Sequence, residues 1–490
     1  MQTGRYRNFV MLHSNDLHGD FLAKDKSGEL TGGVSRLSGY VQKTRSEEPH
    51  VIYCISGDML QGSLIDSEYR GLSTIELMNM LEPDVASLGN HETDYGLTHL
   101  LFLERCARFP IVNANMFIKN PLTRLFNSHT FIEINGMRIM FIGIITEDVM
   151  SGIRADNLIS SLIDINEAAH EVERICAAYD SIDVDLTILL THVGFEEDKK
   201  LAALLDPEWG VDIIIGGHSH TMLEQPEVVN DVLIVQASEG TKQIGRFDIV
   251  VDTELKGVHE YKWQLVPISD SSCPRDEAME NVVLAYKEQT DKKYNRVLCR
   301  LPHELTHPGR KQETELGNLF ADALKVCLGA DIVLCGSGAI RKATLGPLVT
   351  LGSLMETVPF HDKMYLMTVT GKQLKAMWRH ILREQGYGGE HTEFFQISQG
   401  LEITWSREKQ EFLRFDYMGE PVGDNQKLTV AFHSYHRNNC DKSFGLSHGE
   451  LLENGREVVI ATNVQEVLIE YFTDNKPVVC GVDGRLTVEP

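Results

Sequence analysis

Short apolar runs alternate with polar stretches over the first half of the chain, up to about residue 268. The runs that predict strands are residues 8–13, 51–56, 85–89, 110–115, 138–145, 185–192, 212–217, 232–238 and 245–252. Helical segments are expected between some of them, for example at residues 167–179. Alternating strands and helices favour an α/β domain whose central sheets are covered by helices.

The second half of the chain has its own α/β pattern. Apolar residues recur at helical spacing over 316–327, and Gly329 is expected to end that helix. A second helix is expected over 372–385, ending at Gly386, with Leu374, Met377, Trp378 and Ile381 on one face. These apolar faces predict a core.

Residues 274–296 are polar, compatible with a helix and free of internal glycine. We expect a helix that connects two domains, although an ordinary surface helix has the same pattern. The expected division is residues 1–270, a linker helix at 271–298, and residues 299–490.

A chain of 490 residues exceeds what one core organises. Its composition, 42% apolar and 24% charged, is ordinary for a globular protein. It contains no apolar run of about 18 residues, so no membrane span is expected. The first residues lead into a strand without an apolar signal region, and nine cysteines are scattered along the chain. We expect a cytoplasmic protein with reduced thiols, or a secreted or cell-surface one if a signal has been removed.

The formal net charge is −25. This charge makes nucleic acid and anionic membranes poor partners. A phosphate substrate would therefore need local positive charge, which bound cations and a few arginines would supply.

Five of the apolar runs are followed by side chains that commonly bind metals. These are Asp16 and His18; Asp58; Asn90, His91 and Asp94; His192; and His218 and His220. Ligand sites form at the carboxyl ends of strands in α/β sheets. On an extended backbone, His218 and His220 would point to the same side. Even seven oxygen and nitrogen donors from this set exceed what one small ion needs, and favour two ions that share a carboxylate.

The motifs D-x-H, GD, GNHE, TH and GHSH, in this order, resemble those of the calcineurin-like metallophosphoesterases. The second half resembles the C-terminal domain of the 5′-nucleotidase family, so the resemblance covers nearly the whole chain and suggests a bacterial, cytosolic member without a signal. It implies a four-layer α-β-β-α metallophosphoesterase domain, joined by a linker helix to a smaller α/β substrate-binding domain.

The resemblance also implies roles for the donor residues. The first ion would be held by Asp16, His18 and His220, the second by Asn90, His192 and His218, and Asp58 would bridge them. His91 would contact the phosphate and the leaving oxygen, oriented by Asp94. Two cations about 3.5–4 Å apart clamp a phosphoryl group and lower the pKa of a bridging water. The mixed donors fit Zn, Mn, Fe or Co.

In the second half, the resemblance implies a substrate site. Arg310 and Arg341 would bind phosphate, Phe360 and Tyr435 would stack on a base, and Asp441 would hold the ribose hydroxyls. Surface arginines, core aromatics and a turn aspartate are the alternatives. The chain departs from the family pattern at Gly336, at His361-Asp362 and at Asn439-Cys440. Each change alters a polar contact near the base or sugar, so no base preference is predicted.

The predicted activity is hydrolysis of a phosphate ester, most simply of a nucleoside 5′-monophosphate, by a metal-bridging hydroxide. A 2′,3′-cyclic-nucleotide phosphodiesterase or a nucleotide-sugar hydrolase is the alternative. A non-catalytic nucleotide-binding protein is disfavoured, because every expected donor and the His91–Asp94 pair are present. The sequence does not specify the metal, the oligomeric state or any domain motion.

Overall fold

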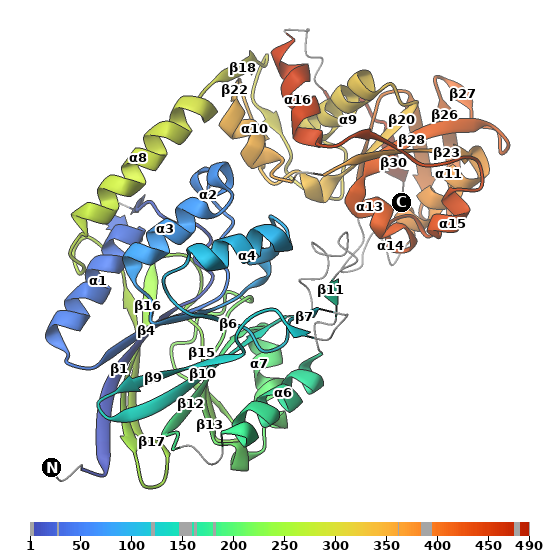
Figure 1. The fold of residues 1–490 in the computed structure, drawn as a ribbon. Helices are drawn as coiled ribbons and strands as arrows, with labels where there is room; N and C mark the ends of the chain where they lie inside the picture. Colours follow the sequence, from blue (N-terminus) through green and yellow to red (C-terminus); the bar gives the residue numbers. More distant parts are fainter. Residues whose placement is uncertain are drawn as a thin grey trace. The chain divides into compact units, whose positions relative to one another are not determined.

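The computed structural model describes residues 4–26, 29–118, 123–146, 159–160, 164–179, 183–360, 362–383, 394–474 and 481–489 (Figure 1). The chain forms two compact units, Met1–Thr290 and Asp291–Pro490. The division falls within the long helix α8, Glu277–Tyr294. The domain boundaries given above therefore stay a prediction.

Unit 1 contains two six-stranded sheets. The first has the order β17 (Gly257–Pro267), β16 (Gln243–Asp252), β1 (Tyr6–Ser14), β4 (Val51–Ser56), β5 (Val85–Ser87) and β6 (Ile111–Val112). The second has the order β14 (Glu227–Val229), β15 (Val232–Val235), β13 (Val211–Ile215), β12 (Leu186–His192), β10 (Met137–Ile145) and β9 (His129–Ile134).

Parallel pairing joins the central strands of each sheet. β1, β4, β5 and β6 run parallel in the first sheet, and β10, β12, β13 and β15 in the second. Parallel strands end at the same edge, so the segments that follow them gather there.

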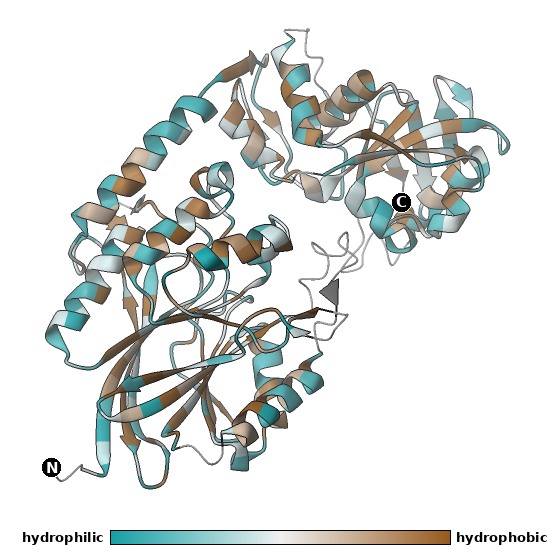
Figure 2. Ribbon diagram, viewed as in Figure 1, coloured by the Kyte–Doolittle hydropathy of each residue, from teal (hydrophilic) through white to brown (hydrophobic). Residues whose placement is uncertain are grey.

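The two sheets pack face to face around buried apolar side chains that include Met11, Ile52, Phe141 and Ile188. In Figure 2 the strands of this region are mostly hydrophobic. Helices α1 (Val34–Glu47) and α3 (Leu72–Leu81) cover the outer face of the first sheet, and α6 (Ile165–Ala178) and α7 (Phe195–Leu204) cover that of the second. The four-layer α-β-β-α arrangement is thus confirmed.

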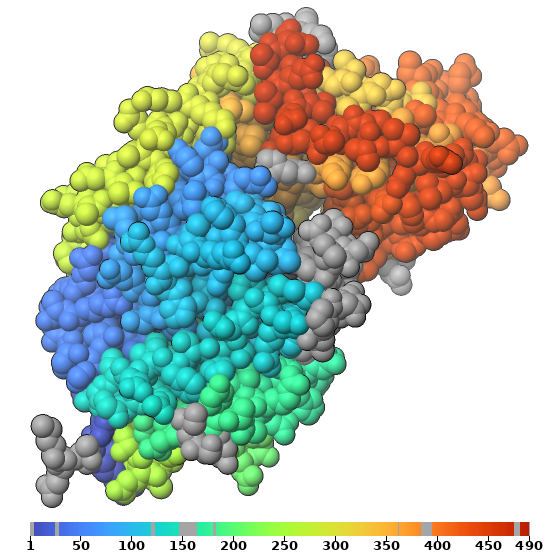
Figure 3. Space-filling model, in the orientation of Figure 1, coloured from blue at the N-terminus to red at the C-terminus, as the bar shows by residue number. Residues whose placement is uncertain are grey.

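The remaining elements of unit 1 are short. They are α2 (Leu64–Tyr69), η1 (Asn90–Thr93), α4 (Leu97–Cys106), η3 (Pro207–Trp209), β2 (Lys24–Lys26), β3 (Glu29–Thr31), β7 (Phe117–Ile118), β8 (Thr123–Arg124) and β11 (Ile159–Ser160). The strand expected over 110–115 is only β6, because the backbone N–H of Asn113 bonds to Asn127 O instead of extending the ladder. In Figure 3 the blue-to-cyan and teal-to-green segments adjoin on the surface of this unit.

Unit 2 is built on a five-stranded sheet and a four-stranded sheet. The first has the order β24 (Phe395–Ile397), β20 (Ile332–Gly336), β28 (Lys427–His433), β23 (Met364–Thr370) and β29 (Val458–Ala461). The second has the order β27 (Glu420–Pro421), β26 (Glu411–Tyr417), β25 (Leu401–Ser406) and β30 (Leu486–Glu489). Two short pairs complete it: β18 (Val297–Arg300) with β22 (Leu348–Thr350), and β19 (Leu305–Thr306) with β21 (Thr344–Leu345).

Two helices of unit 2 lie where the apolar pattern predicted them, α9 (Glu315–Leu328) and α11 (Gly371–Leu382). The other helices were not predicted: η4 (Ser337–Ala339), α10 (Leu351–Thr357), α13 (Ser434–Asn438), α14 (Cys440–Phe444), α15 (His448–Leu451) and α16 (Val464–Thr473). Gly329 ends α9 with a φ of 69°, as expected. Cys327, expected on the buried face of α9, is exposed. Helix α11 ends at Leu382, earlier than expected, and Gly386 lies outside the described residues.

Candidate metal centre

Donor side chains from five separate segments meet at the carboxyl ends of the parallel strands. Three groups each have donor atoms within 4.8 Å of one another: Asp16, His18 and His220; His18, Asp58 and His91; and Asp58, His192 and His218. Asn90 joins the last group, since its Oδ1 lies 2.8 Å from His218 Nδ1. The structure therefore brings together every residue that the sequence suggested as a metal ligand.

Asp58 is the carboxylate that two of these groups share. Its Oδ2 lies 3.0 Å from His192 Nε2 and 3.8 Å from His18 Nε2. Its Oδ1 accepts the backbone N–H of His91 at 2.9 Å. Burial opposes ionisation, but the neighbouring imidazoles outweigh it and hold the pKa of Asp58 below its ordinary value. An ionised carboxylate between two groups of donors is suited to bridge two cations.

Two of the histidines are oriented by backbone carbonyls behind them. His18 Nδ1 lies 3.1 Å from Gln61 O, and His192 Nδ1 lies 2.9 Å from Ser56 O. Each contact fixes a proton on Nδ1 and leaves the Nε2 lone pair for a metal. His192 Nε2 is buried and forms no hydrogen bond of good geometry among the described residues, although Asp58 Oδ2 lies 3.0 Å away. A ring nitrogen and a carboxylate oxygen this close to each other fit a shared cation.

Five of the donor residues have a backbone in the left-handed region. The φ angles are 51° for Asp16, 48° for His18, 52° for Asp58, 77° for His218 and 53° for His220. Non-glycine residues adopt this conformation at a cost, and such residues cluster at functional sites. The extended backbone expected for the last two is therefore wrong. The chain turns here, because His218 N–H donates to both oxygens of Asp16 at 3.0 Å.

Two glycines are required by close approach. A Cβ on Gly217 would lie 2.6 Å from His192 Nδ1 and 2.7 Å from Ser56 O. A Cβ on Gly89 would lie 2.1 Å from Asp58 Oδ1. Only glycine lets these loops approach the donor groups, which explains its place in the motifs.

His91 and Asp94 form a hydrogen-bonded pair beside the donor groups. Their Nδ1 and Oδ2 atoms lie 2.7 Å apart, and Gln61 Nε2 donates to the same oxygen at 3.2 Å. Burial disfavours the imidazolium, but the Asp94 hydrogen bond and the charge of Asp58 outweigh it and raise the pKa of His91 to about 9. The imidazole is therefore poised to donate a proton.

Glu92 supports the loops of the metal centre, a role that the sequence did not predict. The buried carboxylate accepts four backbone N–H groups, from Asp58 at 2.9 Å, Met59 at 2.7 Å, Leu60 at 3.2 Å and Gly89 at 2.6 Å. Burial and the charge of Asp58 nevertheless raise the pKa of Glu92 to about 7. The sequence feature that could have indicated this role is the acidic residue of the GNHE motif, which follows His91 within the short turn η1.

The residues suggested for substrate binding lie on unit 2. The Arg341 guanidinium lies 4.9 Å from the Phe360 ring centroid, within cation–π range. Phe360 and Tyr435 are 37% and 55% exposed, so the core alternative is wrong for both. Arg310 and Asp441 are exposed as well.

Hydrogen bonds bring the segments of Phe360 and Tyr435 together. Ser434 N–H donates to Lys363 O at 2.8 Å, and Ser434 Oγ donates to Asp362 Oδ1 at 2.6 Å. His361 lies outside the described residues. Two exposed aromatic side chains and an arginine thus lie on neighbouring segments of one unit.

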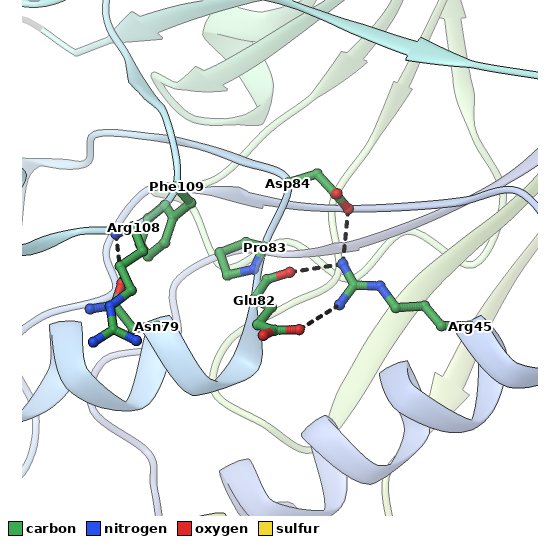
Figure 4. Close-up of a pocket in the computed structure, with 7 residues that line it drawn as sticks. All are labelled: Arg45, Asn79, Glu82, Pro83, Asp84, Arg108 and Phe109. Carbon is green, nitrogen blue, oxygen red and sulfur yellow. Dashed lines mark hydrogen bonds and ion pairs between the residues drawn. The ribbon is translucent and has the colours of Figure 1, made fainter. Parts of the chain in front are cut away.

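A separate cavity of about 440 Å³ lies at the opposite, amino-terminal ends of β5 and β6 (Figure 4). It is lined by Arg45, Asn79, Glu82, Pro83, Asp84, Arg108 and Phe109. Arg45 is committed to an ion pair with Asp84 at 2.9 Å. The cavity therefore has no part in the chemistry of the donor groups.

Comparisons with known proteins match both units. Residues 9–222 match the family model of the calcineurin-like phosphoesterases, and residues 297–446 that of the 5′-nucleotidase C-terminal domain. The trifunctional nucleotide phosphoesterase YfkN of Bacillus subtilis is 28% identical over 81% of this chain, which spans only 29% of that protein. The 5′-nucleotidase of Mus musculus is 26% identical over 97% of this chain and 90% of its own length.

Among solved structures, a 5′-nucleotidase precursor from Thermus thermophilus matches with a TM-score of 0.73. It is 26% identical, and the match covers 99% of both chains. The similarity therefore includes both units.

Proposed function

Because this chain belongs to the enzymes that join a calcineurin-like phosphoesterase domain to a 5′-nucleotidase C-terminal domain, we propose that it hydrolyses nucleoside 5′-monophosphates to nucleosides and phosphate. Membership makes the chain a phosphoesterase of a family that uses divalent metals. The observation that carries the proposal is the position of Asp58, shared between donor groups from both sheets.

In this proposal two divalent cations bind at the donor groups. Asp16, His18 and His220 would hold the first, Asn90, His192 and His218 would hold the second, and Asp58 would be available to both. Bound cations of this kind supply a hydroxide nucleophile at neutral pH and neutralise charge on the phosphoryl group. The buried His192 Nε2, which lies 3.0 Å from Asp58 Oδ2, supports a ligand role for that residue.

The pair His91 and Asp94 is proposed to serve the leaving group. A nucleoside 5′-oxygen is a poor leaving group unless it receives a proton. The 2.7 Å contact with Asp94 keeps a proton on His91 Nδ1 and directs Nε2 away from the carboxylate. His91 then donates the proton from Nε2 to the departing oxygen.

Unit 2 is proposed to select the nucleotide. Exposed aromatic faces such as those of Phe360 and Tyr435 stack on any base, and such stacking contributes about 1–3 kcal/mol per base. Guanidinium groups at Arg310 and Arg341 match phosphate oxygens and partly offset the acidity of the chain. Asp441 would hold the ribose hydroxyls.

A second candidate is a cyclic-nucleotide phosphodiesterase or a nucleotide-sugar hydrolase. One observation favours it: Asp362, which replaces the Asn usual in the family pattern, is hydrogen-bonded to Ser434 at 2.6 Å. This hydrogen bond occupies the Asp362 carboxylate within unit 2. A contact to the base that the family pattern places here would therefore be altered.

The test is a phosphate-release screen of the metal-free chain, reconstituted separately with Mn, Zn and Co. Substrates are 5′-monophosphates, 2′,3′-cyclic nucleotides and nucleotide sugars, with the last two assayed also for the nucleoside monophosphate product. The proposal predicts the highest kcat/KM for 5′-monophosphates. A higher value for a cyclic or sugar nucleotide would select the second candidate, and no turnover of any of them would reject both.

We also propose a cytosolic location, supported by the cysteines of the described residues, which are thiols and not disulfides. No helix among the described residues is long and apolar enough to cross a lipid bilayer. Fractionation of the source cells tests the location. Limited proteolysis tests the proposed boundaries at residues 270 and 298.

A further inference from the structure

We propose that Glu239 is the positioning residue of His220, and that it selectively strengthens binding of the first of the two metal ions. This inference rests on the proposed metal centre. Glu239 lies in the segment after β15, outside the motifs that identify the family.

The contact is direct. Glu239 Oε2 lies 2.7 Å from His220 Nδ1. The other ring nitrogen, Nε2, faces the donor group, 3.4 Å from Asp16 Oδ1 and 3.1 Å from His18 Nε2. A carboxylate behind a metal-binding histidine fixes the proton on the remote nitrogen, orients the ring and makes the metal-binding nitrogen more basic.

The backbone around Glu239 is fixed to the loop that carries the other ligands of the first ion. Ala237 N–H donates to Asn15 Oδ1 at 2.9 Å, and Asn15 Nδ2 donates to Ser238 O at 2.6 Å. On the other side, Gly240 N–H donates to Asp16 O at 2.8 Å. Glu239 is therefore held on both sides by residues that adjoin Asp16.

The backbone of Ser238 supports the same reading. Its φ is 64°, a conformation that costs energy for a residue with a Cβ. Strained residues persist only where surrounding contacts impose them. Here the hydrogen bonds to Asn15 impose this conformation next to Glu239.

The contact distinguishes His220 from His18 and His192. The remote nitrogens of His18 and His192 face neutral backbone carbonyls, whereas that of His220 faces a carboxylate. The His220 side chain is also the most exposed of the three, at 39% against 19% and 0%. Packing holds the first two rings, so His220 depends most on a specific partner.

The effect is expected at one ion only. Glu239 adds a third carboxylate near the first ion, besides Asp16 and Asp58, and it contacts no proposed ligand of the second ion in the described part of the chain. Loss of an orienting carboxylate typically weakens metal binding by about 10- to 100-fold. Substituting Glu239 should therefore weaken the binding of the first ion and leave the binding of the second unchanged.

The experiment titrates Mn²⁺ and Co²⁺ into metal-free wild type, Glu239→Ala, Glu239→Gln and the control Glu224→Ala. Glu224 is an exposed carboxylate in the segment between β13 and β14, the segment that also carries His220. Calorimetry gives the two affinities, elemental analysis gives the stoichiometry, and the visible spectrum of bound Co²⁺ reports the geometry. The metal affinity of Glu239→Ala is expected to fall by about 10- to 100-fold at one of the two sites. Glu239→Gln retains an acceptor and should lose less, and Glu224→Ala should match the wild type.

Thermal unfolding with and without metal separates this role from a purely structural one. Without metal, Glu239→Ala should melt within about 2 °C of the wild type, because the side chain is half exposed. Added metal should raise the melting temperature of Glu239→Ala less than it raises that of the wild type. Wild-type affinities at both sites in Glu239→Ala, or equal losses at both, would overturn the inference while leaving the proposed function intact. Fewer than two ions in the wild type would overturn both.

Discussion

Glu92 Oε2 accepts the backbone N–H of Asp58 at 2.9 Å. The same carboxylate also accepts the N–H groups of Met59, Leu60 and Gly89. It therefore joins the loop after β4 to the loop that carries Asn90 and His91. One buried side chain sets the distance between the shared carboxylate and the second group of donors.

Substitution of Glu92 is predicted to destabilise unit 1 and weaken metal binding. Glu92→Ala leaves four buried N–H groups without an acceptor, which costs on the order of 3 kcal/mol or more. Glu92→Gln should lose less stability, because its amide oxygen still accepts hydrogen bonds. Some stability is still lost, because its NH₂ group faces backbone N–H groups that donated to the carboxylate. Urea unfolding in a chelator measures the stability of both variants, and titration of Mn²⁺ into the metal-free proteins measures the loss of metal binding. Glu47→Ala, an exposed carboxylate, should change stability by less than about 0.5 kcal/mol.

The fall in kcat caused by His91→Ala is predicted to depend on the leaving group of the substrate. If His91 protonates the departing oxygen, kcat for a nucleoside 5′-monophosphate should fall by about 10²- to 10⁴-fold. An activated aryl phosphate, whose leaving group needs no proton, should lose much less. Steady-state kinetics with both substrates measure the difference.

The matched control for this prediction is His170→Ala. His170 is also paired with an acid three residues ahead, Glu173, at 3.2 Å, but lies exposed on α6. It should leave both rates unchanged. Equal losses for the two substrates in His91→Ala would show that His91 acts on the phosphoryl group and not on the leaving oxygen.

The central strands and the ligands that follow them were predictable from the sequence, because burial on both faces leaves a strong apolar signal. The run at 51–56 matches β4 residue for residue, and Asp58 follows it directly. By contrast, β17 was not predicted. Its side chains face solvent along most of the strand, and Trp263 is the residue of β17 that is buried. Pairing with β16, not apolar pattern, determines that strand.

The contacts that orient the ligands were not predictable, because they join loops that are distant in sequence. Glu239 reaches His220 only after β15 has returned beside β13. The backbone conformation of His218 was also not predictable, since it depends on hydrogen bonds that its N–H donates to the Asp16 carboxylate. Sequence motifs identified the donor types, and the tertiary fold determines how each donor is aimed.

The exposed aromatic side chains of unit 2 are predicted to bind the base and not the phosphate. Tyr435→Ala or Phe360→Ala should raise KM for a nucleoside monophosphate by about 5- to 150-fold, as loss of 1–3 kcal/mol implies. An aryl phosphate without a base should show little change. Tyr435→Phe preserves the aromatic face and is the control. An equal rise of KM for both substrates would show that the ring stabilises unit 2 instead of binding a base.

The stability of the chain is predicted to depend on pH through Asp212, a residue outside the metal centre. Its carboxylate accepts the backbone N–H of Thr187 at 2.9 Å, at the amino-terminal end of β13. Burial raises the pKa of Asp212 to about 7, above the ordinary 3.8. Between these values the folded chain binds the proton more tightly than the unfolded chain, so stability falls as the pH rises from about 4 to 7.

Asp212→Asn should remove this component, because the amide oxygen still accepts from Thr187 but carries no titrating group. Water reaches part of the side chain, so the expected gain at pH 7.5 relative to pH 5 is about 1–2 kcal/mol, less than the full pKa difference would give. Urea unfolding of metal-free wild type and variant at both values measures it. Asp231→Asn, at an exposed turn with a φ of 63°, is the control and should follow the wild type at both pH values. If the difference in stability between Asp212→Asn and the wild type is the same at both pH values, Asp212 ionises as readily in the folded chain as in the unfolded one, and its burial carries no cost.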